Sequence, residues 1–132
     1  MTPLLIRAPA RTYSIAQLCR ELGATARALR YYEEIGLVSP LRNGTQRIYG
    51  IRDRARLILI LRGRRVGLSL PEIREILLAH DEGGEASQAA RAYRAFQGRL
   101  QALVMERGQI EDAIRKLRKA CERLSERAPG SA

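Results

Sequence analysis

Residues 14–36 read SIAQLCRELGATARALRYYEEIG, and this stretch decides the fold. It contains two short helical patterns that are separated by a Gly-Ala-Thr turn. Ser14 and Thr25 each offer a side-chain oxygen to the free amides of a first helical turn, and Gln17 completes a capping-box pattern with Ser14. Gly23 is typical of the residue that follows a helix end. The stretch therefore predicts a helix-turn-helix.

A hairpin and two further helices are predicted to follow. Asn43-Gly44 is a strong signal for a tight hairpin turn, and residues 46–49 supply the returning strand. A small hairpin that follows a helix-turn-helix is a wing. Helical periodicity then resumes over 52–66, and Ser69 is placed to cap a fourth helix.

Residues 85–126 carry one sustained apolar repeat with 4-3 spacing, which is typical of a coiled coil. Such a helix does not bury its apolar stripe against the preceding domain alone, so we expect it to pair with its own copy in a homodimer. Packing back onto its own domain is the alternative. The predicted dimer interface consists of Tyr93, Phe96, Leu100, Leu103, Arg107, Ile110, Ile114, Leu117, Cys121 and Leu124.

The sequence thus predicts a mainly helical chain in five parts. A flexible basic arm at 1–11, too short and too interrupted by Pro and Arg for a secretory signal, precedes a winged helix-turn-helix domain at 12–80. A hinge loop at 81–84 then leads to the dimerisation helix at 85–126. Residues 127–132 are expected to be a disordered tail.

Basic residues are concentrated in the first part of the chain. The whole sequence has 24 Lys and Arg against 14 Asp and Glu, a net charge of +10. Residues 1–80 carry a net +8, whereas 81–132 carry only +2. An excess of this size on one domain favours a polyanionic partner, and here we expect double-stranded DNA. A uniformly basic surface without function is the alternative.

Membrane insertion and a disulfide framework are not expected. No stretch approaches the roughly 18 to 20 apolar residues that span a bilayer. Cys19 and Cys121 are far apart in sequence, and each lies in a helical pattern. A reducing cytoplasm is therefore the expected location.

The second predicted helix has the features of a helix that reads the major groove. Thr25, Arg27, Arg30 and Tyr31 lie at or near its N-terminal half, where base contacts are made. Arg27 and Arg30 share one face, and Arg is the commonest bidentate partner of guanine. Tyr32 is expected to pack in the core, although its hydroxyl also suits a phosphate.

The wing and the third helix supply further candidates. Arg42, Arg47 and Tyr49 flank the hairpin turn, and a wing lies against the DNA backbone, so we expect them to contact phosphates. A solvated hairpin with an ordinary strand tyrosine is the alternative. Arg62 and Arg65 end the third helix and are either phosphate contacts or cations that the helix dipole favours.

These stretches together resemble the mercury-resistance-regulator (MerR) family. The resemblance is carried by TYSIAQLCRELGATARALRYYEEIGLVSP at 12–40, by QRIYGIRDRARLILILRGRRVGLSLPEIREIL at 46–77, and by the heptad helix. ALRYYEEIGL matches the family's recognition-helix signature nearly letter for letter. Within the family, the chain is similar to the LiuR-type regulators of branched-chain amino-acid and acyl-CoA catabolism.

The resemblance implies a mode of action. It implies homodimers joined by an antiparallel coiled coil that bind promoters with an overlong spacer. Bending and untwisting that DNA would realign the elements that RNA polymerase recognises, which makes the polymerase a partner. By the same resemblance, Arg30 and Tyr31 contact DNA from the recognition helix, and Arg47 and Tyr49 from the wing.

The sequence departs from the family's metal-sensing pattern, which has a cysteine at the head of the dimerisation helix and paired cysteines beyond its end. Residues 81–87 and 126–132 occupy these places without a cysteine. We expect no metal or cofactor, and either no effector or a small organic one between the coiled-coil end and the partner's fourth helix and following loop. One metal or redox alternative stays open, in which Cys121 approaches His80 and Asp81 of the partner subunit.

An enzyme is not expected from this sequence. One histidine, no glycine-rich phosphate loop and no Ser/Cys-His-carboxylate set leave little from which to assemble an active site. The competing interpretation is an adaptor or structural coiled-coil protein with a basic head. The RYYEE helix and the Asn-Gly wing favour a DNA-binding transcriptional regulator instead.

Overall fold

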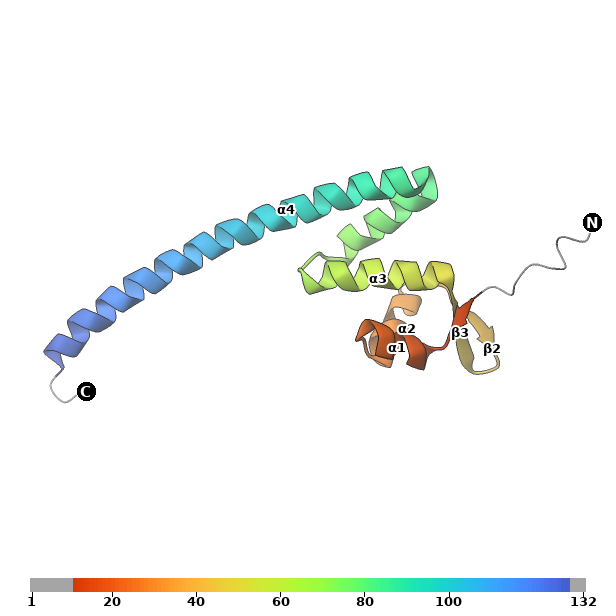
Figure 1. The fold of residues 1–132 in the computed structure, drawn as a ribbon, viewed down its shortest axis with the longest axis horizontal. Coiled ribbons are helices and arrows are strands. Elements are labelled where there is room, and N and C mark those ends of the chain that lie inside the picture. Colours follow the sequence, from red (N-terminus) through yellow and green to blue (C-terminus); the bar gives the residue numbers. More distant parts are fainter. Residues whose placement is uncertain (1–10, 129–132) are drawn as a thin grey trace, which may run out of the picture. The chain divides into compact units, whose positions relative to one another are not determined.

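The computed structural model of the protein describes residues 11–128. Its element order confirms the predicted fold class, a mainly helical winged helix-turn-helix that is followed by a long helix (Figure 1). The predicted arm at 1–11 and tail at 127–132 lie largely outside the described residues. The elements are β1 (Thr12–Tyr13), α1 (Ile15–Leu22), α2 (Ala26–Glu34), β2 (Leu41–Asn43), β3 (Gln46–Gly50), α3 (Ile51–Arg65) and α4 (Leu70–Arg127).

The helix-turn-helix forms where its capping residues predict it. The Ser14 hydroxyl accepts from the Gln17 amide at 3.1 Å, and the Gln17 side chain accepts from the Ser14 amide at 2.8 Å. Thr25 caps α2 by accepting from the Ala28 amide at 3.1 Å. Gly23 takes the left-handed conformation (φ 68°) that lets the chain leave α1 and enter the turn.

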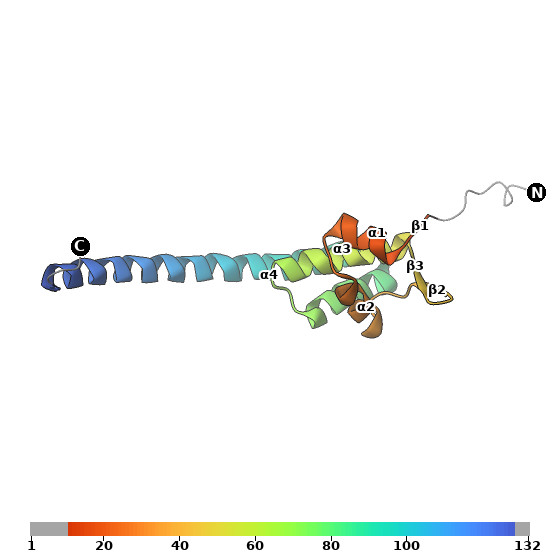
Figure 2. The ribbon, with the colours of Figure 1, turned by 90° about the horizontal axis from the view of Figure 1, so that it is seen from below.

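A three-stranded antiparallel sheet with the order β1-β3-β2 accompanies the helices. Strand β1 is absent from the sequence prediction, because two residues are too few to show alternation. The hairpin turn is also one residue later than predicted. Asn43 pairs with Gln46, so the two turn residues are Gly44 and Thr45. Gly44 has φ 66°, which fits the first central position of a type II′ turn. The hairpin β2–β3 projects from the group of helices (Figure 2).

The core of the helix-turn-helix domain (the head) contains residues from every helix and from β3. Tyr32 is buried, which confirms its predicted core position. Gly63 allows close packing of α3 on α4, because a Cβ there would lie 3.1 Å from the side chain of Ile73. The core residues are Leu18, Leu29, Tyr32, Leu37, Val38, Tyr49, Leu57, Ile60, Leu68, Ile73, Ile76 and Leu77.

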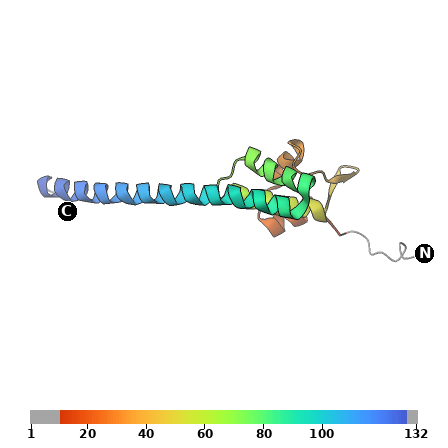
Figure 3. The same cartoon turned by 90° about the horizontal axis from the view of Figure 1, so that it is seen from above.

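A single residue replaces the hinge loop that was expected at 81–84. Ser69 caps α4, accepting from the Glu72 amide at 3.2 Å, and the helix then continues through 83. Only Gly84 leaves the helical conformation (φ 76°, ψ −162°), in a region that glycine enters without steric cost. The chain turns back sharply at this bend (Figure 3).

The C-terminal unit, residues 94–132, is separate from the unit formed by the rest of the chain. Its described part is the helical continuation of α4. Along it Phe96 is half-buried, and the later residues of the predicted dimer interface are solvent-exposed in the single chain, among them Leu100, Ile110, Leu117 and Cys121. No described helix is long and apolar enough to cross a membrane.

Candidate nucleic-acid interface

Helix α2 has one buried and one basic face. Leu29 and Tyr32 are in the core. Arg27 and Arg30 are exposed on the other side, and neither forms an ion pair among the described residues. Tyr31 is 45% exposed. These unpaired guanidiniums on a short exposed helix are free to contact an anion or a base edge.

Thr25 has a structural task in addition to its predicted DNA contact. Its hydroxyl oxygen accepts from the Ala28 amide and thereby fixes the start of α2. The residue is exposed. A hydroxyl that accepts one hydrogen bond still has its own proton to donate, so capping leaves the predicted contact available.

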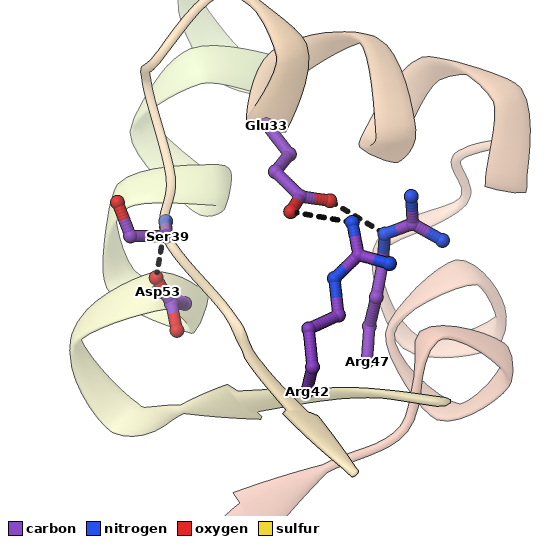
Figure 4. A network of polar contacts seen from close by, with 5 residues as sticks. All are labelled: Glu33, Ser39, Arg42, Arg47 and Asp53. Carbon is purple, nitrogen blue, oxygen red and sulfur yellow. Dashed lines mark hydrogen bonds and ion pairs between the residues drawn. The ribbon is translucent and has the colours of Figure 1, made fainter. Parts of the chain in front are cut away.

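One carboxylate joins α2 to the wing. Glu33, in the last turn of α2, accepts from Arg47 Nε at 2.5 Å and from Arg42 Nη2 at 3.0 Å (Figure 4). The Glu33 and Arg47 side chains are each 20% exposed, and that of Arg42 is 51% exposed. The hydrogen bond from Arg47 holds the pKa of the Glu33 carboxyl below its ordinary value, and the carboxylate raises the pKa of Arg47.

A second carboxylate holds the base of the wing. Asp53, in the first turn of α3, accepts from the Ser39 amide at 3.1 Å (Figure 4) and from the Gly50 amide at 3.0 Å. These two amides lie just before β2 and at the end of β3. Asp53 therefore links both ends of the hairpin to α3. Glu33 links the arginine side chains of the hairpin to α2.

A shallow notch of about 390 Å³ lies between α2 and the wing. Three of its five lining residues are arginines that the sequence predicts to contact DNA. Two acidic residues from the end of α2 complete the wall. The lining consists of Arg30, Glu33, Glu34, Arg42 and Arg47. The notch brings together one predicted base-reading arginine and two predicted phosphate-binding ones.

Tyr49 does not lie on this surface. Its side chain is fully buried, and its hydroxyl has no hydrogen-bond partner among the described residues. Burial raises the pKa of this phenol. The predicted phosphate contact is thus corrected: Tyr49 is the ordinary strand tyrosine of the alternative interpretation. The reason is that β3 runs directly into α3, so the end of the strand is covered by the helices.

The arginines at the end of α3 are used differently from one another. Arg65 Nη2 donates to the carbonyl oxygen of Leu22 at 2.8 Å. Arg64 Nη1 donates to the carbonyl oxygen of Leu68 at 3.0 Å. Arg62 is exposed and lines a cleft on α3. Of the three, Arg62 is the one that forms no hydrogen bond to a carbonyl oxygen among the described residues, although Arg64 and Arg65 are exposed as well.

Sequence reasoning missed Glu33 and the ion pair between Arg54 and Glu21. Arg54 donates to Glu21 from α3 to α1, and its guanidinium also lies over the Tyr13 ring at 5.7 Å. Both acids lie in helices that also carry arginine, Arg20 in α1 and Arg27 and Arg30 in α2. An acidic residue in a helix that carries arginine could have suggested an ion pair. The sequence does not say which arginine forms that pair.

The described part of the chain contains no cluster of side chains that could bind a metal ion. No three His, Cys, Asp or Glu side chains within 11–128 are grouped so that they could hold one ion. Cys19 is half-buried on α1, and Cys121 is exposed on α4.

Two family descriptions match the chain. Residues 13–80 match "MerR HTH family regulatory protein", and residues 54–126 match "MerR, DNA binding". A curated relative, the HTH-type transcriptional regulator CueR of Vibrio cholerae, is 34% identical over 108 residues, which cover 76% of this chain and 78% of that protein. Heavy metal-dependent transcription regulator 2 of Rhizobium meliloti is 35% identical over 81 residues, 60% of this chain and 55% of that protein.

Solved structures give the same fold. The HTH-type transcriptional regulator SkgA from Caulobacter crescentus has 30% identity and a TM-score of 0.56, over 86% of this chain and 80% of that one. HiNmlR, described as a MerR family regulator lacking the sensor domain and bound to promoter DNA, has a TM-score of 0.61 over 79% of each chain. Its identity is 21%, so this likeness concerns the fold alone.

Proposed function

This chain belongs to the MerR family of helix-turn-helix regulatory proteins and is a DNA-binding transcriptional regulator, and on that premise we propose how it binds and acts. It binds an inverted-repeat operator in double-stranded promoter DNA as a homodimer, and it controls transcription by distorting that DNA. The observation that carries the proposal is the exposed basic face of α2 beside a wing whose arginines share one carboxylate with it.

The DNA contacts divide by type. Arg27, Arg30 and Tyr31 project from the exposed face of α2 and are assigned to the major groove, with Arg30 as the principal base reader. Arg42 and Arg47 on the wing are assigned to phosphates, which fix the position of the protein on the duplex. Arg62 is a further phosphate contact.

Dimerisation is proposed to use the apolar stripe of α4. In the single chain Leu100, Ile110, Ile114 and Leu117 are exposed, and soluble proteins seldom leave such a stripe open to water. An antiparallel pairing of two copies covers it and relates the two reading heads by a two-fold axis. Two-fold symmetry in the protein requires an inverted repeat in the operator. The bound dimer distorts the promoter DNA and thereby realigns the elements that RNA polymerase recognises. This takes place in the bacterial cytoplasm.

A small organic effector, where one acts, is proposed to bind near the bend of α4. A cleft of about 270 Å³ lies there, with an apolar floor from α3 and a rim of charged residues. It is lined by Arg52, Ala55, Arg56, Ile58, Leu59, Arg62, His80, Glu85 and Gln88. The resemblance to LiuR-type regulators, which rests on sequence, supports an organic ligand.

The test of the proposed function is a footprint of the full-length protein on its own promoter. We expect protection of two half-sites related by inversion and centred a whole number of helical turns apart. Protection that does not depend on the sequence, or a single unpaired half-site, would contradict the proposal.

A further inference from the structure

Glu33 places a negative charge on the proposed DNA-binding surface, which weakens the attraction of that surface for phosphate. It lies in the last turn of α2, and its carboxylate faces the notch between that helix and the wing. A phosphate that approaches this notch meets a negative charge. Binding strength alone would therefore favour a neutral residue at this position, so the carboxylate needs another explanation.

The geometry supplies one. Each oxygen of the Glu33 carboxylate accepts from a different wing arginine, Arg47 at 2.5 Å and Arg42 at 3.0 Å (Figure 4). In the hairpin these two arginines are register partners on β3 and β2. The carboxylate thus fixes both strands of the wing relative to the helix that carries Arg30. Charge-assisted pairs with a guanidinium add directional specificity as well as energy.

We infer that Glu33 is a positioning residue for sequence specificity, which holds the wing arginines in register with the reading face of α2 and limits their attraction to DNA of the wrong sequence. This rests on the proposed function, in which α2 reads bases and the wing binds phosphates. Phosphate contacts carry no sequence information themselves, but they fix the register in which bases are read. Untethered arginines pair with any phosphate and in many registers.

The chain contains a matched control for this inference. Glu34 is the next residue of α2, is exposed, and lines the same notch. It forms no hydrogen bond or ion pair among the described residues. Glu33→Gln and Glu34→Gln therefore remove the same charge from nearly the same place, and only Glu33→Gln removes a carboxylate that pairs with the two wing arginines.

Affinities of the full-length protein and the two variants are measured by fluorescence anisotropy over a salt series. One duplex carries the operator found by footprinting the protein's own promoter, and the other is a scrambled duplex of equal length and composition. Both variants gain affinity for the scrambled duplex because a negative charge is lost. For that duplex, the salt slope of Glu33→Gln is steeper than that of Glu34→Gln by about one to two units, since two guanidiniums become available to phosphates.

The ratio of operator affinity to scrambled affinity decides the inference. It falls at least about five-fold in Glu33→Gln and stays within about two-fold of the parent in Glu34→Gln. Equal ratios in the two variants would overturn the inference. Glu33→Asp keeps the charge but shortens the reach to both arginines. We expect it to lower the ratio as well, and an unchanged ratio in a folded Glu33→Asp would also overturn the inference.

The parent protein separates this inference from the proposed function. A parent that binds both duplexes equally contradicts the proposed function and removes the basis of the inference. A parent that discriminates, together with a Glu33→Gln variant that discriminates equally well, contradicts the inference alone. Thermal melting of each variant checks that the head remains folded.

Discussion

Arg65, in the last turn of α3, donates a hydrogen bond from Nη2 to the carbonyl oxygen of Leu22 at 2.8 Å. Leu22 is the last residue of α1, where a helix leaves its carbonyl groups without intrahelical partners. The bond therefore closes the end of α1 and ties the helix-turn-helix to α3. Arg65 was predicted from sequence as a DNA contact, and this bond gives it a role in the fold that the sequence does not reveal.

Arg65→Ala is expected to destabilise the head. Loss of the bond to Leu22 lowers the free energy of unfolding by about 0.5–1.5 kcal/mol, the usual net contribution of one hydrogen bond. Arg62→Ala, from the same turn of α3 and without a hydrogen bond among the described residues, is the control and stays within about 0.5 kcal/mol of the parent. Urea unfolding measures both. Equal destabilisation by the two variants would show that the bond does not matter.

Arg30→Ala is expected to weaken operator binding by about 1–3 kcal/mol and to blur discrimination at one base pair in each half-site. The reason is that Arg30 is exposed on the reading face of α2 and forms no ion pair among the described residues. Binding to a panel of operators, each with one base pair changed, measures the effect. An Arg30→Ala variant with the parent's affinity and preference would show that the reading face is assigned wrongly.

Arg107→Leu is expected to raise the melting temperature of the dimer. Arg107 is the one charged residue of the predicted dimer interface, and a charge at such a position costs stability while it fixes the register. In the single chain it is exposed, and its Nε lies 3.8 Å from Glu111 Oε1. For a protein of the dimer's size, each kcal/mol gained corresponds to roughly 2–4 °C.

Arg94→Leu is the control for that substitution, because Arg94 is an exposed residue of α4 outside the predicted interface. It should leave the melting temperature nearly unchanged. Light scattering of the parent is the companion measurement. A monomer at micromolar concentration would contradict the dimer and leave each long helix with an open apolar stripe.

The contact between Glu33 and the wing should weaken in acid. The pKa of Glu33 is held below its ordinary value of 4.5, chiefly by the hydrogen bond from Arg47. A carboxyl whose pKa is lower in the folded state stabilises the fold above the unfolded pKa, and this contribution is lost as the pH falls through the folded pKa. Stability should therefore decline below about pH 4.5, and less steeply in Glu33→Gln.

Glu21 limits the size of that difference, because its pKa is also lowered, by the hydrogen bond from Arg54. Urea midpoints between pH 6 and pH 3 should thus show a reduced, not abolished, acid sensitivity in Glu33→Gln (roughly the range in which native carboxylates protonate). Glu34→Gln should follow the parent. Parallel curves for the parent and Glu33→Gln would contradict a stabilising contact with the wing.

The helix-turn-helix was predictable because its signals are local. Ser14, Gln17 and Thr25 satisfy amides three residues away, and Gly23 takes the conformation that ends α1. The turn of the wing was placed one residue too early. A glycine at position 44 fits either the second residue of a type I′ turn or the first residue of a type II′ turn, and the pairing of Asn43 with Gln46 decides between them.

The candidate site was predictable only in part, because its remaining features depend on contacts between elements distant in sequence. The sequence pattern of β3 does not show that the helices cover the C-terminal end of this strand. Tyr49 lies at that end and is buried, although the sequence predicts it at the surface. Glu33 meets Arg42 and Arg47 across the notch at sequence separations that no local pattern predicts. Strand β1 exists only because β3 offers it an edge.

Replacing both cysteines by alanine is expected to leave promoter control unchanged in the presence of Cu, Zn, Hg or peroxide. A soft-metal site needs two or more converging thiolates. In this chain Cys19 is half-buried on α1, and Cys121 is an exposed member of the apolar stripe of α4. A reporter fused to the protein's own promoter measures the response in parent and variant, and a gel shift confirms that the variant still binds.

The experiment can distinguish the two outcomes because curated relatives include regulators described as heavy metal-dependent. If the parent responds to a metal or oxidant and the double variant does not, Cys121 acts in sensing, with His80 and Asp81 of the partner subunit as the first residues to substitute.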